Sequence, residues 1–274
     1  MILVTGASGA LGGAILDRLA GHDVVAGSRS PVGDAARLVD FDEPATLATA
    51  FDGVDVLVFV SAGYADDDVV LARHGAVVDA AAKAGVRHVV YTSLVGSGDG
   101  LGIALAHRWT EARLAAAPFD VTVLRNGLYA EIPASLAVAA AESGVFEVPW
   151  GDGRLSVVAR EDLADVAAKV ALTSADHVGR SYELEGVTAV GGQDVADALT
   201  AALGRPIAYR PVPLGALWHL PQPPFQVAHT VSLCSNVNAG RLDLRPGDLP
   251  ALLDAPPRSA LDVITAAVAR PPLG

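Results

Sequence analysis

A glycine-rich turn at residues 6–12 offers the most specific chemistry in this sequence. Gly6, Gly9 and Gly12 follow an apolar run over residues 2–5 and precede a helical pattern. A strand, such a turn and a helix form a cradle for pyrophosphate. The first glycine permits the tight turn, the second lets the phosphate approach, and the third lets the helix pack on the strand. We therefore expect a dinucleotide to bind here, with contacts from Gly6, Ser8, Gly9, Ala10, Leu11 and Gly12.

The end of the second predicted strand indicates which dinucleotide that is. An Asp or Glu at this place accepts from the ribose 2′-hydroxyl of NAD, whereas an Arg accommodates the 2′-phosphate of NADP. This chain has Ser28 and Arg29 there, and no carboxylate at the strand end. A guanidinium pairs bidentately with phosphate, and a serine hydroxyl adds a donor. The sequence therefore predicts NADP(H) as the cofactor.

Two further loops follow predicted strands and are candidates for cofactor contacts. Asp40 and Phe41 would flank the adenine, and Ser61, Ala62 and Gly63 are small enough for the chain to pass close to the dinucleotide. A simple turn is the alternative interpretation of each loop. Because open α/β sheets bind ligands at the carboxyl ends of their strands, contact is favoured in both cases.

The elements that position these residues alternate along the first half of the chain. The strands are predicted over residues 2–5, 23–26, 55–60, 88–92 and 121–125. The helices are predicted over residues 10–20, 44–51, 68–84 and 106–117. The strands are almost continuously apolar, which is typical of a parallel sheet covered on both faces. We expect an α/β protein with a doubly wound, Rossmann-like parallel sheet.

The regular alternation of predicted strands and helices ends after residue 125. Helices are predicted over residues 134–143, 161–172 and 193–203, strands over 155–158 and 181–184, and an extended segment over 206–212. Frequent prolines over residues 211–224 indicate a loop or lid, and residues 249–269 are expected to be helical in parts. We expect a dinucleotide-binding domain over residues 1–130, to which 155–187 return. Residues 131–154 and 188–274 would form a smaller α+β substrate-binding lobe.

The composition limits the class of partner. The 274 residues are 51% hydrophobic and carry a net charge of −12, with no basic stretch, which argues against nucleic acid or an anionic membrane surface. A single cysteine, Cys234, excludes an intrachain disulfide and a cysteine-based zinc site. The sequence shows neither a secretory signal nor a membrane-length apolar run, so we expect a cytoplasmic protein. Its expected partner is a small-molecule substrate, with a homodimer as a further option.

Several segments together resemble a known family. They are the glycine turn, Ser28-Arg29, and residues 39–42, 88–93, 124–129, 151–154 and 160–164. This combination resembles the NmrA-like group of atypical short-chain dehydrogenases, and within it the NADPH-dependent quinone reductase type. The resemblance implies that Thr92 and Ser93 end a strand beside the nicotinamide. It also implies that Asn126, Gly127 and Tyr129 line the nicotinamide and substrate pocket.

The chain departs from short-chain dehydrogenases in general at their catalytic motif. A Tyr-x-x-x-Lys sequence follows the serine there, but none of the five tyrosines in this chain has a lysine four residues on. His107 falls near the lysine position and shares a helix face with Glu111. His107 could be a general acid that Glu111 orients and whose pKa it raises. It could instead bond the nicotinamide ribose, or the pair could be a structural contact, and these two interpretations together are favoured. His74 is interpreted as a packed helix residue.

The missing motif still permits one kind of reduction. Reduction of a simple ketone leaves an alkoxide that needs a positioned proton donor, whereas a quinone leaves a phenolate, whose conjugate acid has a pKa of about 10. Ser93 and Tyr129 would steady the developing oxyanion by hydrogen bonds. The sequence thus predicts an NADPH-dependent reductase acting on a quinone or similar conjugated acceptor, without flavin or metal.

Two other functions remain open on the same fold. One is a catalytically silent sensor of NADP(H). The other is a biosynthetic tailoring enzyme, such as a ketoreductase, epimerase or lyase. Its substrate would be shaped by Trp150, Trp218, His219 and Phe225.

Overall fold

The computed structural model describes residues 1–33, 36–62, 65–243 and 247–269. The chain forms two compact units. The first unit comprises Met1–Leu94, Ile103–Asn126 and Leu163–Tyr182, and the second comprises Val95–Gly102, Gly127–Asp162 and Glu183–Gly274. In the described part of the chain, no helix is both long and apolar enough to cross a membrane.

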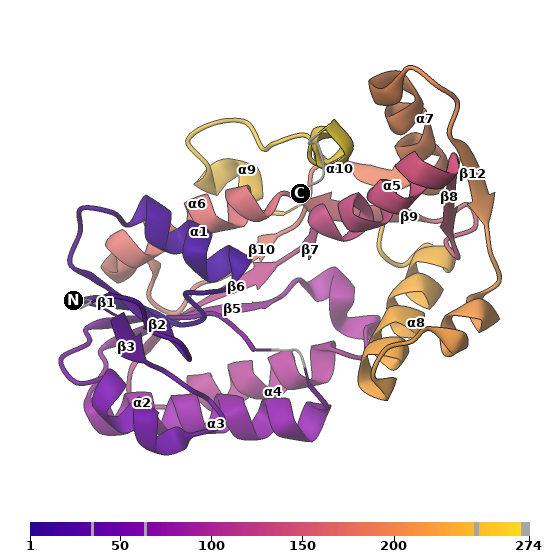
Figure 1. The fold of residues 1–274 in the computed structure, drawn as a ribbon. Coiled ribbons are helices and arrows are strands. Elements are labelled where there is room, and N and C mark those ends of the chain that lie inside the picture. The colour runs from indigo at the N-terminus through magenta and orange to yellow at the C-terminus, as the bar shows by residue number, and fades with distance from the viewer. Residues whose placement is uncertain (34–35, 63–64, 244–246, 270–274) are drawn as a thin grey trace. The chain divides into compact units, whose positions relative to one another are not determined.

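A seven-stranded sheet organises the first unit (Figure 1). Its order is β10-β6-β5-β4-β1-β2-β3. The strands are β1 (Ile2–Val4), β2 (Val24–Ser28), β3 (Ala36–Leu38), β4 (Val56–Phe59), β5 (His88–Leu94), β6 (Asp120–Asn126) and β10 (Ser181–Leu184). All pairings from β3 across to β6 are parallel. The strand order reverses between β1 and β4, and such a switch point is where open parallel sheets bind ligands.

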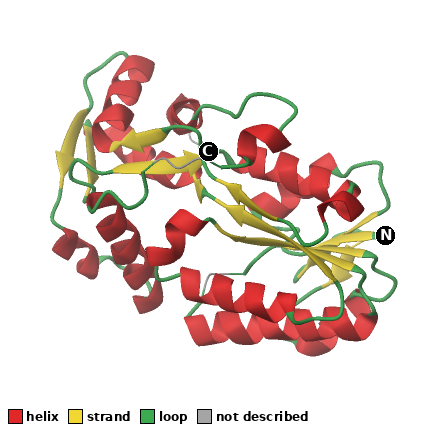
Figure 2. Ribbon diagram, turned by 180° about the vertical axis from the view of Figure 1, so that it is seen from behind, coloured by secondary structure: helices red, strands yellow, loops and turns green. Residues whose placement is uncertain are grey.

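Helices cover both faces of this sheet. They are α1 (Ala10–Arg18), α2 (Pro44–Ala50), α3 (Asp67–Ala84), α4 (Ala104–Ala115) and the first-unit part of α6 (Arg160–Leu172). Helices α2, α3 and α4 lie on one face, and α1 and α6 lie on the other (Figures 1 and 2). An ion pair between Arg18 and Asp165 joins α1 to α6. The predicted doubly wound α/β fold is confirmed.

The apolar strands of this sheet fold as the sequence predicts because both of their faces are covered. Every residue of β5 is buried, since β4 and β6 flank it and helices cover it. Leu57 and Phe59 of β4 and Leu3 of β1 belong to the same core. Strand β2 extends two residues beyond its predicted end and finishes at Ser28, directly before Arg29. The strands therefore deliver their carboxyl ends to one edge of the sheet, where the loops that follow β1, β2 and β4 begin.

The second unit holds two small sheets and five complete α-helices within the described residues (Figure 2). Its strands are β7 (Leu128–Tyr129), β8 (Val145–Val148), β9 (Arg154–Val158), β11 (Ala189–Gly191) and β12 (Ala208–Pro211). They pair in the orders β11-β9-β7 and β12-β8. The helices are α5 (Glu131–Ser143), α7 (Gly192–Leu203), α8 (Pro224–Asn238), α9 (Leu249–Leu252) and α10 (Ala260–Ala269).

The proline-rich segment is more regular than the sequence indicates. Leu214–His219 forms a 3₁₀ helix, and α8 then begins at Pro224 and continues for 15 residues. Proline is favoured in the first turn of a helix because its missing N–H has no partner to lose there. The last proline of the segment thus starts a helix, where we predicted only the end of a loop or lid.

Candidate functional site

The glycine turn after β1 has the geometry of a phosphate cradle. Gly6 has a φ of +62°, in the left-handed region that favours glycine. A Cβ atom on Gly12 would lie 2.2 Å from the carbonyl oxygen of Gly6. Gly6 therefore makes the tight turn, and Gly12 permits the close contact between helix and strand. Gly9 is the N-cap of α1 and has no side chain to occupy that helix N-terminus, so the first-turn N–H groups can face an anion.

A cavity of about 450 Å³ opens at the carboxyl ends of β1, β2 and β4, at the switch point of the sheet. It brings together most of the predicted cofactor-binding residues. These are Gly6, Ser8, Gly9, Ser28, Arg29, Asp40, Phe41, Ser61 and Ala62. The cavity is also lined by Val39, Asp42, Val60 and Arg73.

The other predicted cofactor-binding residues do not line this cavity. They are Ala10, Leu11, Gly12, Thr92, Asn126 and Gly127, while Gly63 lies outside the described residues. Leu11 and Gly12 are buried behind the turn. Thr92 contacts a cavity-lining residue instead, because its Oγ1 accepts a hydrogen bond of 2.9 Å from the backbone N–H of Ser61.

Two guanidinium groups line the cavity, and they differ in their partners. Arg73 of α3 donates two hydrogen bonds of 2.7 Å to the carboxylate of Asp42. This contact raises the pKa of Arg73 and lowers the pKa of Asp42, to which the charge of Arg29 also contributes. Arg29 is exposed and makes no hydrogen bond or ion pair with any residue that the structure describes. An anion in the cavity would thus meet one guanidinium, that of Arg29, which no carboxylate of the described residues holds.

Sequence reasoning missed Arg73. Its position in the middle of a long helix shows no motif, and only the fold reveals which face of α3 borders the cavity. Asp42 was recognised as part of the loop that carries Asp40 and Phe41, but a helical partner 31 residues away leaves no local signal.

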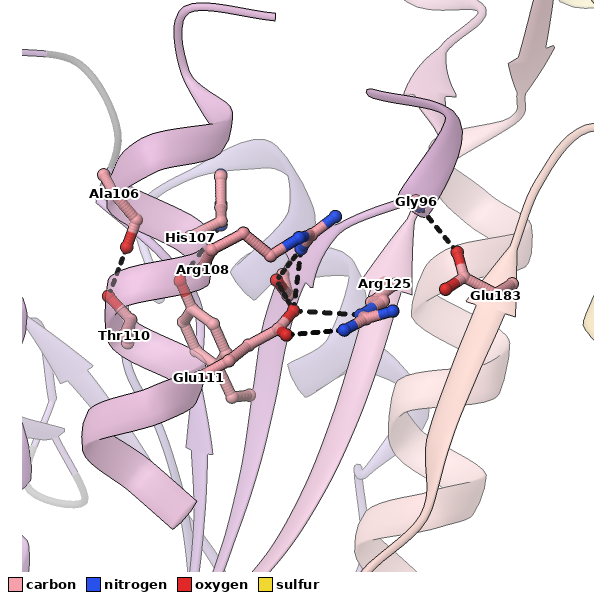
Figure 3. A network of polar contacts seen from close by, with 10 residues as sticks. Gly96, Ala106, His107, Arg108, Thr110, Glu111, Arg125 and Glu183 are labelled. Atoms are coloured by element: carbon pink, nitrogen blue, oxygen red, sulfur yellow. Dashed lines mark hydrogen bonds and ion pairs between the residues drawn. The ribbon is translucent and has the colours of Figure 1, made fainter. Parts of the chain in front are cut away.

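Ser93 belongs to a second polar cluster in the first unit, centred on Glu111 (Figure 3). The Ser93 hydroxyl donates to Glu111 Oε1 at 2.5 Å, and Arg108 donates to the same oxygen at 2.8 Å. Arg125, the register partner of Ser93 on β6, donates to Glu111 Oε2 at 2.7 Å. Burial alone would raise the pKa of Glu111, but hydrogen bonds from Arg125 and Ser93 hold it below its usual value. Glu111 is therefore an ionised acceptor whose two oxygens are both bonded.

His107 does not pair with Glu111. Its Nδ1 lies 3.0 Å from the hydroxyl of Tyr91, while Glu111 turns toward Arg108 and Arg125 (Figure 3). Burial, aided by the charge of Arg108, lowers the pKa of His107 to about 4 and outweighs the opposite effect of Glu111. The structure contradicts the interpretation, disfavoured from the sequence, in which Glu111 orients His107 as a general acid. Two guanidinium groups hold the carboxylate, and the upward effect of Glu111 on the pKa of His107 is smaller than the effect of burial. His107 is a neutral imidazole at pH 7.

The residues after β6 have separate environments. Asn126 is buried in the first unit, and its Oδ1 accepts no hydrogen bond within the described part of the chain. Gly127 belongs to the second unit, where an added Cβ would lie 2.8 Å from Leu184 O, so close packing accounts for its missing side chain. Tyr129, also in the second unit, lies beneath the guanidinium of Arg160, whose Cζ is 5.1 Å from the ring centroid.

Two tryptophans suggested for a substrate pocket have different surroundings. Trp150 is 1% exposed and packs edge-on against Phe146 in the core of the second unit. It therefore does not line an open pocket, contrary to expectation. Trp218 is 60% exposed.

Comparison with known proteins finds relatives along most of the sequence. Quinone oxidoreductase 2 of Escherichia coli (strain K12) is 35% identical over 223 residues, which make up 77% of this chain and 77% of that protein. The crystal structure of an NADPH-dependent quinone oxidoreductase from Escherichia coli in complex with NADPH shares 30% identity and superposes with a TM-score of 0.88. That match covers 97% of this chain and 99% of the other.

A second solved structure is equally similar in fold. The triphenylmethane reductase of Citrobacter sp., crystallised with NADP(H), superposes with a TM-score of 0.88 at 28% identity and covers 97% of this chain and 100% of its own. The model of the NmrA-like family matches residues 1–247. Since that match includes both the cavity at the sheet edge and the Glu111 cluster, the relation extends beyond the glycine turn. The chain belongs to the NmrA-like family.

Proposed function

We propose that this chain is an NADP(H)-dependent reductase that delivers a hydride to a quinone or a similar conjugated acceptor. The observation that carries the proposal is the cavity at the switch point of the sheet, with Arg29 at its wall. No carboxylate among the residues that the structure describes pairs with that guanidinium. When bound, NADPH supplies the hydride. The residues of the chain bind and orient the cofactor and the acceptor.

The residues around the cavity fit the adenosine and phosphate parts of NADP(H). Arg29 can form two parallel hydrogen bonds to a 2′-phosphate. Ser28 Oγ accepts a hydrogen bond of 3.1 Å from Ser30 N–H, so its own proton remains for the same phosphate. The turn from Gly6 to Gly9 and the N-terminus of α1 suit the pyrophosphate.

Asn126 suits the opposite end of the dinucleotide. A buried carbonyl oxygen without a donor is costly, and most such groups are satisfied in a native structure. The carboxamide of a nicotinamide offers N–H donors of the required kind. We therefore assign Asn126 Oδ1 to the carboxamide, in agreement with the place that the family resemblance implies.

The acceptor end favours a substrate that needs no strong acid. His107, with a pKa of about 4, can donate a hydrogen bond as a neutral imidazole but holds no dissociable proton at pH 7. The Ser93 hydroxyl donates a hydrogen bond to Glu111, so we assign Ser93 to positioning that carboxylate. Tyr129 remains our candidate for the hydrogen-bond donor to the oxyanion. A reduced quinone oxygen can take its proton from water, since its conjugate acid has a pKa of about 10.

The relatives support this class of acceptor. One is a quinone oxidoreductase, and another is a triphenylmethane reductase connected with triphenylmethane dyes, whose colour comes from a conjugated system. Their identities to this chain are 35% and 28%, which supports a shared reaction type and leaves the choice of substrate to this chain's own pocket.

Purified protein mixed with NADPH and a set of quinones tests the proposal by the loss of NADPH absorbance. We expect oxidation of NADPH faster than the uncatalysed rate and slower turnover with NADH. Tight binding of NADPH without turnover of any acceptor would instead support a silent cofactor sensor. Absence of both binding and turnover would overturn the cofactor assignment as well.

A further inference from the structure

His74 on α3 is a fully buried histidine whose two ring nitrogens both have partners. Its Nε2 accepts a hydrogen bond of 3.1 Å from the backbone N–H of Ala62. Its Nδ1 lies 2.8 Å from Thr110 Oγ1. The Thr110 hydroxyl donates to Ala106 O at 2.7 Å, a bond visible in Figure 3. Since Ala62 N–H can only donate and the Thr110 proton is already used, Nδ1 carries the imidazole proton.

The ring of His74 is held in this orientation on its faces and edges as well. It packs edge-on against Phe59, with the ring centroids 5.0 Å apart, and against Tyr91 at 6.0 Å. Burial, with smaller contributions from His107 and Arg73, lowers the pKa of His74 to about 3. Nε2 is therefore a permanent acceptor at physiological pH.

The contact with Ala62 completes a series at the end of β4. Three consecutive backbone N–H groups donate to side chains from three separate segments, namely the residue after β1, strand β5 and helix α3. Val60 donates to Thr5 at 2.9 Å, Ser61 to Thr92 at 2.9 Å, and Ala62 to His74 at 3.1 Å. Val60, Ser61 and Ala62 all line the cavity. The course of this wall thus depends on side-chain acceptors, because β4 ends at Phe59 and its ladder with it.

We propose that His74 is a positioning residue for the cofactor, because it holds Ala62 and so shapes the cavity wall past which the dinucleotide runs. The proposal rests on the proposed function, since it takes the cavity as the NADP(H) site. A merely packed residue in this place would need only volume. His74 supplies an acceptor at one defined atom, which an apolar side chain of equal size lacks.

Two amide variants separate the acceptor from the rest of the side chain. In His74→Gln the amide oxygen reaches the place of Nε2 and can accept from Ala62. In His74→Asn the amide lies at the place of Nδ1, can donate to Thr110, and leaves Ala62 N–H without an acceptor. Both variant side chains are polar and smaller than histidine. Each retains one of the two hydrogen bonds, Gln the one from Ala62 and Asn the one to Thr110.

The test is a fluorescence titration with NADPH of the unaltered chain and both variants, at a temperature where thermal unfolding shows all three to be folded. We expect His74→Asn to raise the Kd about tenfold, as an unpaired buried N–H implies, and His74→Gln to raise it by less than about threefold. If the Kd for NADPH rises equally in both variants, or more in His74→Gln than in His74→Asn, the role of His74 is overturned while the proposed function stands. An unaltered chain that binds no NADPH would overturn the proposed function and this role with it.

If either variant does not fold, hydrogen exchange of the unaltered chain decides. We expect the Ala62 amide to be protected without cofactor and more protected with NADPH. Exchange of Ala62 as fast as that of an exposed amide would contradict the proposal.

Discussion

The cavity at the sheet edge and the Glu111 cluster, both in the first unit, differ in whether their charged side chains have partners within the chain. In the cavity, Arg29 is exposed and pairs with no carboxylate in the described ranges of the chain, although the charge of Arg29 contributes to lowering the pKa of Asp42. In the cluster, Glu111 has both oxygens bonded by Arg108, Arg125 and Ser93. A guanidinium that pairs with no described carboxylate can pair with an external anion, whereas a carboxylate with both oxygens bonded holds its neighbours in place. We infer that the cavity is built for binding and the cluster for order.

The largest effect is expected from Arg29→Ala, which should weaken binding of NADPH in the cavity. Loss of two charge-assisted hydrogen bonds is expected to weaken NADPH binding by about a hundredfold and NADH binding by less than about threefold. Titration of each cofactor measures both. Arg87→Ala, which removes the same charge from a 76%-exposed side chain outside the cavity, serves as the control. Equal losses for NADPH and NADH would show that Arg29 does not contact the phosphate.

A fall in pH should affect both regions through their neutral histidines. The pKa values of His74 and His107 lie at about 3 and about 4, below the ordinary 6.5. Below pH 6.5 the unfolded chain therefore binds protons that the folded chain does not, so the free energy of unfolding falls as the pH falls. For a fully buried histidine the loss between pH 6.5 and pH 5 is about 2 kcal/mol. Urea unfolding at several pH values measures it, and a constant stability over this interval would contradict the assignment of two neutral imidazoles.

Glu111→Gln tests whether the Glu111 cluster contributes to stability. The variant keeps the shape of the side chain but removes the charge that two guanidiniums share, and we expect a loss of about 1–2 kcal/mol in the free energy of unfolding. Glu147→Gln, which breaks the exposed ion pair with Arg210, should cost less than about 0.5 kcal/mol. Denaturant titration compares them. If Glu111→Gln leaves stability unchanged but abolishes NADPH binding, the division between the two regions is wrong.

Ser93→Ala should have the smallest effect on turnover. The Ser93 proton is donated to Glu111, so we expect kcat with a quinone to fall by less than about threefold, whereas removal of an oxyanion donor costs about a hundredfold or more. Steady-state kinetics with saturating NADPH measure this. A hundredfold loss would restore Ser93 as a donor to the reacting oxygen.

Local patterns predicted most of the binding region. The roles of Gly6 and Gly12 follow from a turn between a strand and a helix, and Arg29 follows from a strand end. These features are contiguous in sequence, so the sequence alone could reveal them. The doubly wound parallel sheet followed from repeated strand–helix units with right-handed crossovers, whereas the order of its strands comes from the structure.

Contacts between distant elements were beyond sequence reasoning. The spacing of His107 and Glu111 fits a pair on one helix face, but Arg125 on β6 captures the carboxylate. Arg73 borders the cavity from a helix that carries no motif. His74 was interpreted as a packed helix residue. It is buried, but the hydrogen bond from Ala62 is visible only once the end of β4 is in place.

The preference of the unaltered chain between NADP⁺ and NAD⁺ tests the central claim most directly. Calorimetric titration gives both Kd values under one condition. We expect NADP⁺ to bind about a hundredfold more tightly, because only its 2′-phosphate engages Arg29 and Ser28. Equal Kd values for the two dinucleotides would contradict it.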